Sequence, residues 1–191
     1  METLIFATNN QHKVDEIRAV VGPGFEMLTL KEAGILVDIP EPHDTLEENA
    51  REKSRFIYKM TGKSCFSEDT GLEVEALNGE PGVNSARYAG EDKSFEKNME
   101  KLLKNLEGVT NRKARFRTVI SLIRDGVEHQ FEGICEGTIA RAPSGTGGFG
   151  YDPVFIPEGE TRSFAEMSAG EKHKISHRTR AVEQLVNFLT L

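Results

Sequence analysis

The residues best suited to chemistry lie in the C-terminal third of the chain. A glycine-rich turn over 145–153 contains Phe149, Tyr151 and Asp152, and about twenty residues later the segment 171–180 holds four Lys or Arg and two His. Because the whole chain has a formal net charge of -7, this concentrated positive charge predicts an anionic ligand. Aromatic rings in the turn can stack on a planar base. The two segments together indicate a polyanion site beside a pocket for a planar ring.

Two known nucleotide motifs are excluded for the glycine-rich turn. Gly145, Gly147 and Gly150 have the spacing of a dinucleotide fingerprint, but residues 151–153 lead into a predicted strand, whereas that fingerprint opens a helix. No Lys followed by Ser or Thr comes after the glycines, so a P-loop is excluded as well. The alternative to a ligand-binding turn is a loop with a purely structural role.

The basic segment offers two kinds of hydrogen-bond donor. Lys172 and Lys174 suit contact with phosphate, while His177 and Arg178 carry N–H groups that could recognise a keto oxygen on a ring. The alternative is the charged, solvated start of a helix.

A second phosphate-type motif lies near the N-terminus. The predicted strand 3–7 leads through small polar residues into a helix that carries Val14, Ile17 and Val21 at helical spacing. Backbone N–H groups at a helix N-terminus favour a phosphate, and Lys13 lies one turn into this helix. The arrangement suits a triphosphate; the alternative is an Asn N-cap beside a solvated lysine.

The adjacent carboxylates Glu68 and Asp69 provide the chemistry of a metal site or a general base. They lie between the apolar runs 64–67 and 72–77, so we expect them at a turn between two strands. There both could bind one hard cation, or one could bind metal while the other deprotonates water. The alternative is a solvated acidic turn. Upstream acids could help to hold magnesium: Asp38, Glu41, Asp44, Glu47 and Glu48.

The remaining pattern predicts the elements that position these residues. Apolar residues at helical spacing predict helices over 14–21, 45–60, 93–107 and 182–189. Strands are expected at 3–7, 25–30, 64–67, 72–77 and 154–156, with a loop over 31–44. The runs 114–123 and 127–140 flank an Asp-Gly turn and predict an antiparallel hairpin. We therefore predict an α/β domain with a mixed sheet.

Length and composition limit the class of protein. The 191 residues, of which 37% are hydrophobic, fit one globular domain, within which two lobes are possible. No stretch has the length and apolarity of a membrane span or a secretory signal, so we expect a cytosolic protein without membrane contact. Cys65 and Cys135 form no CxxC pair and are expected to be buried thiols. The acidic pI, near 5.4, argues against a nucleic-acid binder.

Five ordered motifs, taken together, are more specific than any one of them. They are Thr8-Asn9-Asn10-x-x-Lys13, Ser67-Glu68-Asp69-Thr70-Gly71-Leu72, Pro81-Gly82-x-x-Ser85-Ala86-Arg87-Tyr88-Ala89-Gly90, Gly147-Gly148-Phe149-Gly150-Tyr151-Asp152-Pro153 and Ile175-Ser176-His177-Arg178. From residue 1 to residue 191 the chain resembles the inosine triphosphate pyrophosphatase family. The resemblance implies hydrolysis of non-standard purine nucleoside triphosphates, such as ITP, dITP and XTP, to the monophosphate and pyrophosphate with Mg²⁺. It also implies an α/β fold with a long mixed sheet flanked by helices, two lobes with the active cleft between them, and a homodimer.

The resemblance also implies roles for individual residues. Asp69 becomes the proton acceptor and a metal ligand, with Glu41 or Glu68 as a further metal ligand, although Glu47 or Glu48 could replace Glu41. The nucleotide is assigned to Thr8, Asn9, Asn10, Gln11, His12, Lys13, Thr70, Phe149, Gly150, Tyr151, Asp152, Lys172, His177 and Arg178. We expect Asp69 and magnesium to activate a water for attack at the α-phosphorus while Lys13 holds the leaving pyrophosphate.

Two other functions compete with this interpretation. One is a pyrophosphatase with a different base preference, for example for modified pyrimidines, which would keep Lys13 and the acidic site but differ around Phe149 and His177. The other is a nucleotide-binding sensor that does not hydrolyse its ligand, in which Asp69→Asn would leave function intact.

Overall fold

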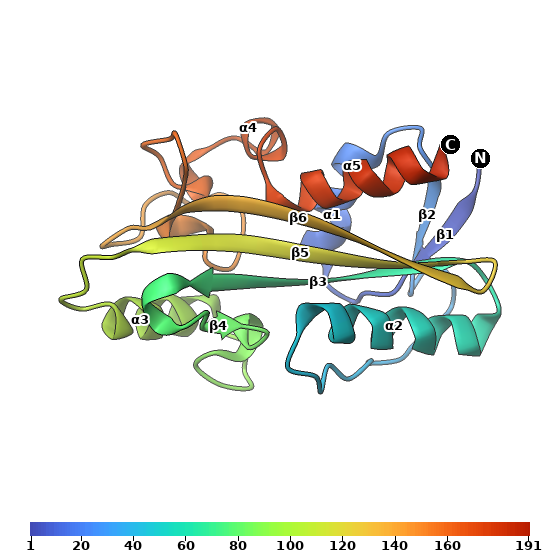
Figure 1. The fold of residues 1–191 in the computed structure, drawn as a ribbon, viewed down its shortest axis with the longest axis horizontal. Helices are drawn as coiled ribbons and strands as arrows, with labels where there is room; N and C mark the ends of the chain where they lie inside the picture. The colour runs from blue at the N-terminus through green and yellow to red at the C-terminus, as the bar shows by residue number, and fades with distance from the viewer. The chain divides into compact units, whose positions relative to one another are not determined.

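The computed structural model describes all residues, 1–191, as an α/β fold with one mixed sheet. Six of its seven strands follow the order β2-β1-β3-β5-β6-β7, and the seventh, β4, pairs with β3 outside this path. The chain divides into two compact units, residues 1–69, 118–133 and 178–191 in the first and residues 70–117 and 134–177 in the second. The predicted mixed sheet flanked by helices is confirmed (Figure 1), while the position of the cleft stays a prediction.

Three long strands contribute residues to both units: β3 (Cys65–Val74), β5 (Lys113–Arg124) and β6 (Val127–Ile139). The turn between β5 and β6 has Asp125 at φ 51° and Gly126 at φ 80°. Positive φ at both central residues is the geometry that Asp-Gly favours in a two-residue hairpin. The predicted hairpin is thus confirmed.

The first unit has helices on both faces of its part of the sheet (Figure 1). Its further elements are β1 (Thr3–Phe6), α1 (Gln11–Val21), β2 (Glu26–Thr29), α2 (Leu46–Thr61) and most of α5 (His177–Leu189). β1 pairs in parallel with β2 and with β3. Leu4, Phe6 and Phe66 pack in one core cluster with residues of α1 and α5. Ile5 and Cys65 pack on the other face with Ile57 of α2, as strand alternation requires.

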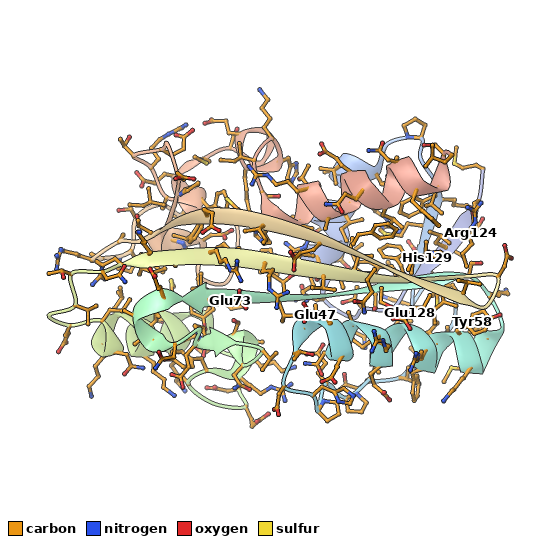
Figure 2. The ribbon with its side chains drawn as sticks, in the orientation of Figure 1. Glu47, Tyr58, Glu73, Arg124, Glu128 and His129 are labelled. Carbon is orange, nitrogen blue, oxygen red and sulfur yellow. The ribbon has the colours of Figure 1, made fainter.

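Helix α2 is fixed at its ends and along one side. The Thr45 side chain accepts a hydrogen bond from the N–H of Glu48, and Gly62 closes the helix in the left-handed conformation. Along its length, Arg51 and Arg55 pair with Glu128 of β6 at 2.8 and 3.1 Å, where Figure 2 shows Glu128 beside the helix. These contacts hold the buried face of α2 against the sheet.

The second unit has its own hydrophobic core. Its further elements are β4 (Pro81–Gly82), α3 (Phe95–Asn105), β7 (Phe155–Pro157) and α4 (Ala169–His173), joined by 3-10 turns at Glu75–Leu77, Ser85–Arg87, Asp152–Val154 and Phe164–Glu166. Leu72, Leu102 and Phe155 pack in this core. The strand predicted at 154–156 therefore starts one residue later, because residues 152–154 form a 3-10 turn. No helix in either unit is both long and apolar enough to span a membrane.

Candidate active site

The two adjacent carboxylates lie inside a strand, which corrects the predicted turn. β3 runs without interruption from Cys65 to Val74, so Glu68 and Asp69 are neighbours in extended backbone. Neighbouring side chains of a strand point to opposite faces of a sheet. Glu68 shares the face of Phe66, which packs with α1 and α5, and Asp69 shares the face of Cys65, which packs with α2. The two acids therefore have different partners.

Glu68 lies in a buried chain of alternating charges. Its Oε1 is 2.7 Å from Nζ of Lys13 and 3.6 Å from a guanidinium nitrogen of Arg178, and Arg178 in turn pairs with Glu16. Burial alone would favour the neutral acid, but Lys13, Arg178 and Lys53 outweigh it and hold the pKa of Glu68 far below its usual range. Glu68 is therefore ionised over the whole physiological pH range.

Asp69 has the opposite electrostatic environment. Its side chain is buried, and Oδ2 has no hydrogen-bond partner in the protein. Burial raises the pKa of Asp69 to about 6, with Glu41 and Glu68 adding repulsion while Lys53 and Lys13 oppose the shift. A carboxylate with a pKa near neutrality and an unpaired oxygen has the properties of a general base.

Lys53 of α2 connects Asp69 with Glu41. Its ammonium lies 2.7 Å from Oε1 of Glu41 and 3.8 Å from Oδ1 of Asp69, and it also donates to the backbone oxygen of Glu68 at 2.7 Å. Lys53 was not among the residues predicted for the site. A signal was available, because position 53 lies on the same helical stripe as the buried residues Leu46, Ala50 and Ile57. A lysine on a buried stripe indicates a specific partner.

The donor set fits magnesium through two carboxylates. Mg²⁺ takes oxygen ligands and commonly uses one or two carboxylates together with water and phosphate oxygens. Asp69 offers a buried oxygen without a partner, and Glu41 shares Lys53 with it. No group of three or more His, Cys, Asp or Glu side chains forms a complete metal cage. Among the upstream acids, Glu41 is thus the one that lies with Asp69 around a common cation.

The predicted phosphate motif forms a capped helix start. The side chain of Asn10 accepts a hydrogen bond from the N–H of Lys13 at 3.3 Å, and Thr8 Oγ1 accepts one from the N–H of Asn10. The side-chain amide of Asn9 donates a hydrogen bond to the carbonyl oxygen of Val37 at 2.8 Å. Gln11 and His12 are exposed in the first turn of α1. Lys13 forms an ion pair with Glu68, so this turn belongs to the same site as the acids.

A second cluster, in the second unit, centres on Asp152. One oxygen of this buried carboxylate, Oδ2, accepts hydrogen bonds from Nζ of Lys172 at 2.6 Å and from the N–H of Phe149 at 3.1 Å. The same ammonium lies 5.1 Å from the centre of the Phe149 ring. The predicted aromatic turn and the basic segment are thus brought together. Thr70 follows Asp69 in β3 and is half-buried.

Two residues predicted to face the base are buried in the second unit. Tyr151 belongs to the core of the second unit and donates its hydroxyl to the carbonyl of Ser85 at 2.6 Å, so its ring offers no open stacking surface. His177 is 3% exposed and stacks on Phe116, with ring centres 4.6 Å apart. The guanidinium of Arg178 lies in the Glu68 network. Gly150 has φ 61° and continues this turn.

We expect Gly148→Ala to destabilise the second unit. Gly148 has φ 67°, and an added Cβ would lie 2.0 Å from Oδ2 of Asp152, so the substitution adds backbone strain and displaces the partner of Lys172. Strain costs about 1–2 kcal/mol, and loss of a buried ion pair costs roughly 3 kcal/mol more. Urea unfolding measures the difference. Gly150→Ala is the matched control, because φ there is 61° but nothing lies within 4 Å; equal losses in the two variants would contradict the role given to Asp152.

Comparison with known proteins identifies relatives over the full length. Residues 4–188 match the Ham1 family. The chain is 57% identical to a dITP/XTP pyrophosphatase of Porphyromonas gingivalis. The aligned residues cover 99% of this chain and 98% of that protein. A Ham1 protein of Staphylococcus aureus is 41% identical with a TM-score of 0.90, over 99% of this chain and 98% of that one. A HAM1 protein of Coxiella burnetii is 37% identical with a TM-score of 0.91, over 100% and 99%.

Proposed function

This chain belongs to the Ham1 family, and on that premise we propose that it hydrolyses non-standard purine nucleoside triphosphates, namely ITP, dITP and XTP, to the monophosphate and pyrophosphate. The relatives named dITP/XTP pyrophosphatase support the substrate class. The observation that carries the proposal within this chain is the buried Asp69, whose pKa is raised to about 6 and whose Oδ2 has no hydrogen-bond partner. Such a group suits proton transfer rather than a purely structural role.

Asp69 acts as the general base. It accepts a proton from a water molecule, whose oxygen attacks the α-phosphorus in line with the leaving pyrophosphate. The bond from the α-phosphorus to the bridging oxygen breaks, and the products are the nucleoside monophosphate and pyrophosphate. Lys53 lies 3.8 Å from Oδ1 of Asp69 and keeps enough of the carboxylate ionised for this step at neutral pH.

The triphosphate is bound by the turn from Thr8 to Lys13. The first turn of α1 presents backbone N–H groups, and Lys13 adds a positive charge for the leaving pyrophosphate. We propose Mg²⁺ as cofactor, held by Glu41 and Asp69, with Glu68 as a supporting acid. When bound, the ion supplies Lewis-acid stabilisation of the phosphoryl oxygens.

The nucleoside is bound by the cluster around Asp152. Phe149 provides an aromatic face for the base, and its backbone and Lys172 are fixed by the same carboxylate oxygen. His177, with nearby backbone, is the donor proposed for the 6-keto oxygen. A 6-amino group would place donor against donor, and an unpaired buried donor costs about 1–3 kcal/mol, or roughly 5- to 150-fold in kcat/KM.

The experiment that tests this function is pyrophosphate release from ITP, XTP, ATP and GTP. We expect kcat/KM for ITP and XTP to exceed that for ATP by roughly 5-fold or more, since one unpaired buried donor costs about 1–3 kcal/mol. Modified pyrimidine triphosphates serve as the comparison for the competing specificity. Release from these pyrimidines alone would replace the purine assignment, and no release from any triphosphate by folded protein would leave only a nucleotide sensor.

Two further properties belong to the proposal. We also propose a homodimer and a cytoplasmic location, which the family resemblance supports. Light scattering on the purified protein tests the first, and fractionation of cells tests the second.

A further inference from the structure

Lys53 is a buried cation placed between two acids that the proposed reaction needs. The residue is 5% exposed, and its ammonium contacts Glu41 at 2.7 Å and lies 3.8 Å from Asp69. The ammonium also donates a hydrogen bond to the backbone oxygen of Glu68 at 2.7 Å. All of its partners are therefore oxygens, two of them from carboxylates.

This set of partners resembles the ligand set of a metal ion. Mg²⁺ also binds carboxylate oxygens, and it needs only one or two of them when phosphate and water complete its coordination. The space between Glu41 and Asp69 holds an ammonium instead. Two carboxylates and one carbonyl oxygen therefore lie around this ammonium within the protein.

The charge of the whole cluster sets what else it can bind. Four carboxylates, Glu16, Glu41, Glu68 and Asp69, are joined by ion pairs to three cations, Lys13, Lys53 and Arg178. When all are ionised, the cluster carries one excess negative charge. A divalent ion would leave it positively charged, which is unfavourable in a buried site with a low effective dielectric constant. The negative charge of a bound triphosphate would offset the positive charge that the divalent ion leaves.

We propose that Lys53 is the resident counter-ion of the acidic site, and that a divalent cation must compete with its ammonium for Glu41 and Asp69. The consequence is ordered loading. The protein without nucleotide binds a divalent ion weakly. The ion enters together with the triphosphate, whose negative charge offsets the charges of the ion and of the Lys53 ammonium. This inference rests on the metal ligands named in the proposed function, but not on hydrolysis.

The test is a calorimetric titration of Mn²⁺ into nucleotide-free protein. We expect Lys53→Met to bind Mn²⁺ at least tenfold more tightly than the wild type, because the competing charge is gone. Lys53→Arg, which keeps a cation, should stay within threefold of the wild type. Adding Glu41→Gln to Lys53→Met should abolish the gain, which locates the ion at these acids.

A second variant guards against misfolding. Lys53→Gln keeps an N–H donor for the carbonyl of Glu68 while removing the charge, so it is expected to fold where Lys53→Met does not, and to show the same gain. Mn²⁺ should also raise the melting temperature of either neutral variant more than that of the wild type. Unchanged or weaker Mn²⁺ binding in the folded neutral variants would overturn the inference. Because no nucleotide is present, a failure of the proposed hydrolysis would not alter this result.

Discussion

Asp69→Asn is expected to abolish pyrophosphate release from ITP while leaving the fold intact. A general base contributes typically 10²- to 10⁴-fold to a rate, and asparagine has the shape of aspartate without its ability to accept a proton at neutral pH. We therefore expect kcat to fall by about 10³-fold or more. Single-turnover measurement of pyrophosphate release with saturating ITP and Mg²⁺ tests this. Retained turnover would remove Asp69 from the reaction.

The same substitution is expected to stabilise the protein above pH 6. The pKa of Asp69 is raised in the folded state from 3.8 to about 6, so folding favours its protonated form. That contribution to stability is complete below the unfolded pKa and is lost as the pH rises through about 6. Asparagine cannot ionise and avoids the loss, which we place at about 2 kcal/mol, or a melting temperature higher by roughly 4–8 °C.

The pH dependence separates this effect from a general change in packing. Melting curves at pH 8 and pH 4, recorded with EDTA and without nucleotide, should show a large difference between variant and wild type at pH 8 and almost none at pH 4. Glu52→Gln, at an exposed position of α2, is the control for removal of one negative charge. An equal gain at both pH values would contradict the electrostatic explanation.

The secondary structure was predictable wherever one local signal decided it. The β5–β6 hairpin followed from Asp125 and Gly126, whose positive φ values few other residues adopt. The turn predicted at residues 68–71 was wrong for a tertiary reason. A Cβ at Gly71 would lie 2.5 Å from the backbone oxygen of Gly82, so this glycine permits the close pairing of β3 with β4 and does not end the strand.

The site was predictable in its acids and less so in its cations. The motif that contains Glu68 and Asp69 stood out because adjacent acids end an apolar run. Lys53 was overlooked because a single lysine in a charged helix is normally solvated, and only its place on the buried stripe distinguishes it. Local sequence could not reveal that Glu16 pairs with Arg178, since 162 positions separate them along the chain.

Side-chain orientation was the other limit. The sequence does not indicate whether the ring of Phe149 or that of Tyr151 faces a ligand. In the structure the hydroxyl of Tyr151 donates a hydrogen bond to the carbonyl oxygen of Ser85. Ser85 also accepts the N–H of Leu72 and donates to the carbonyl of Gly82. Through these hydrogen bonds the motif that spans residues 81–90 supports both β3 and the glycine-rich turn. Its sequence alone did not indicate this role.

Glu68→Gln should strongly destabilise the protein, in contrast to the neighbouring Asp69→Asn. The glutamine keeps the size of the side chain but removes the charge shared by Lys13 and Arg178, which are left as buried cations with fewer partners. Breaking a buried pair in this way costs about 3–5 kcal/mol, so the melting temperature should fall by roughly 6 °C or more at pH 7. Thermal unfolding followed by circular dichroism measures this directly.

The sign of the pH effect is also opposite for the two acids. Because the pKa of Glu68 is lowered in the folded state, its contribution is present above the unfolded pKa of about 4.3 and is lost as the pH falls below that value. The difference between wild type and Glu68→Gln should therefore be constant from pH 6 to 8 and shrink below pH 4. A loss that persists unchanged at pH 3 would mean that Glu68 acts through packing and not through its charge. That result would contradict the proposed difference between the two adjacent residues. Asp69 is assigned as the base and Glu68 as the ion-pair partner of the buried cations because their electrostatic environments are opposite.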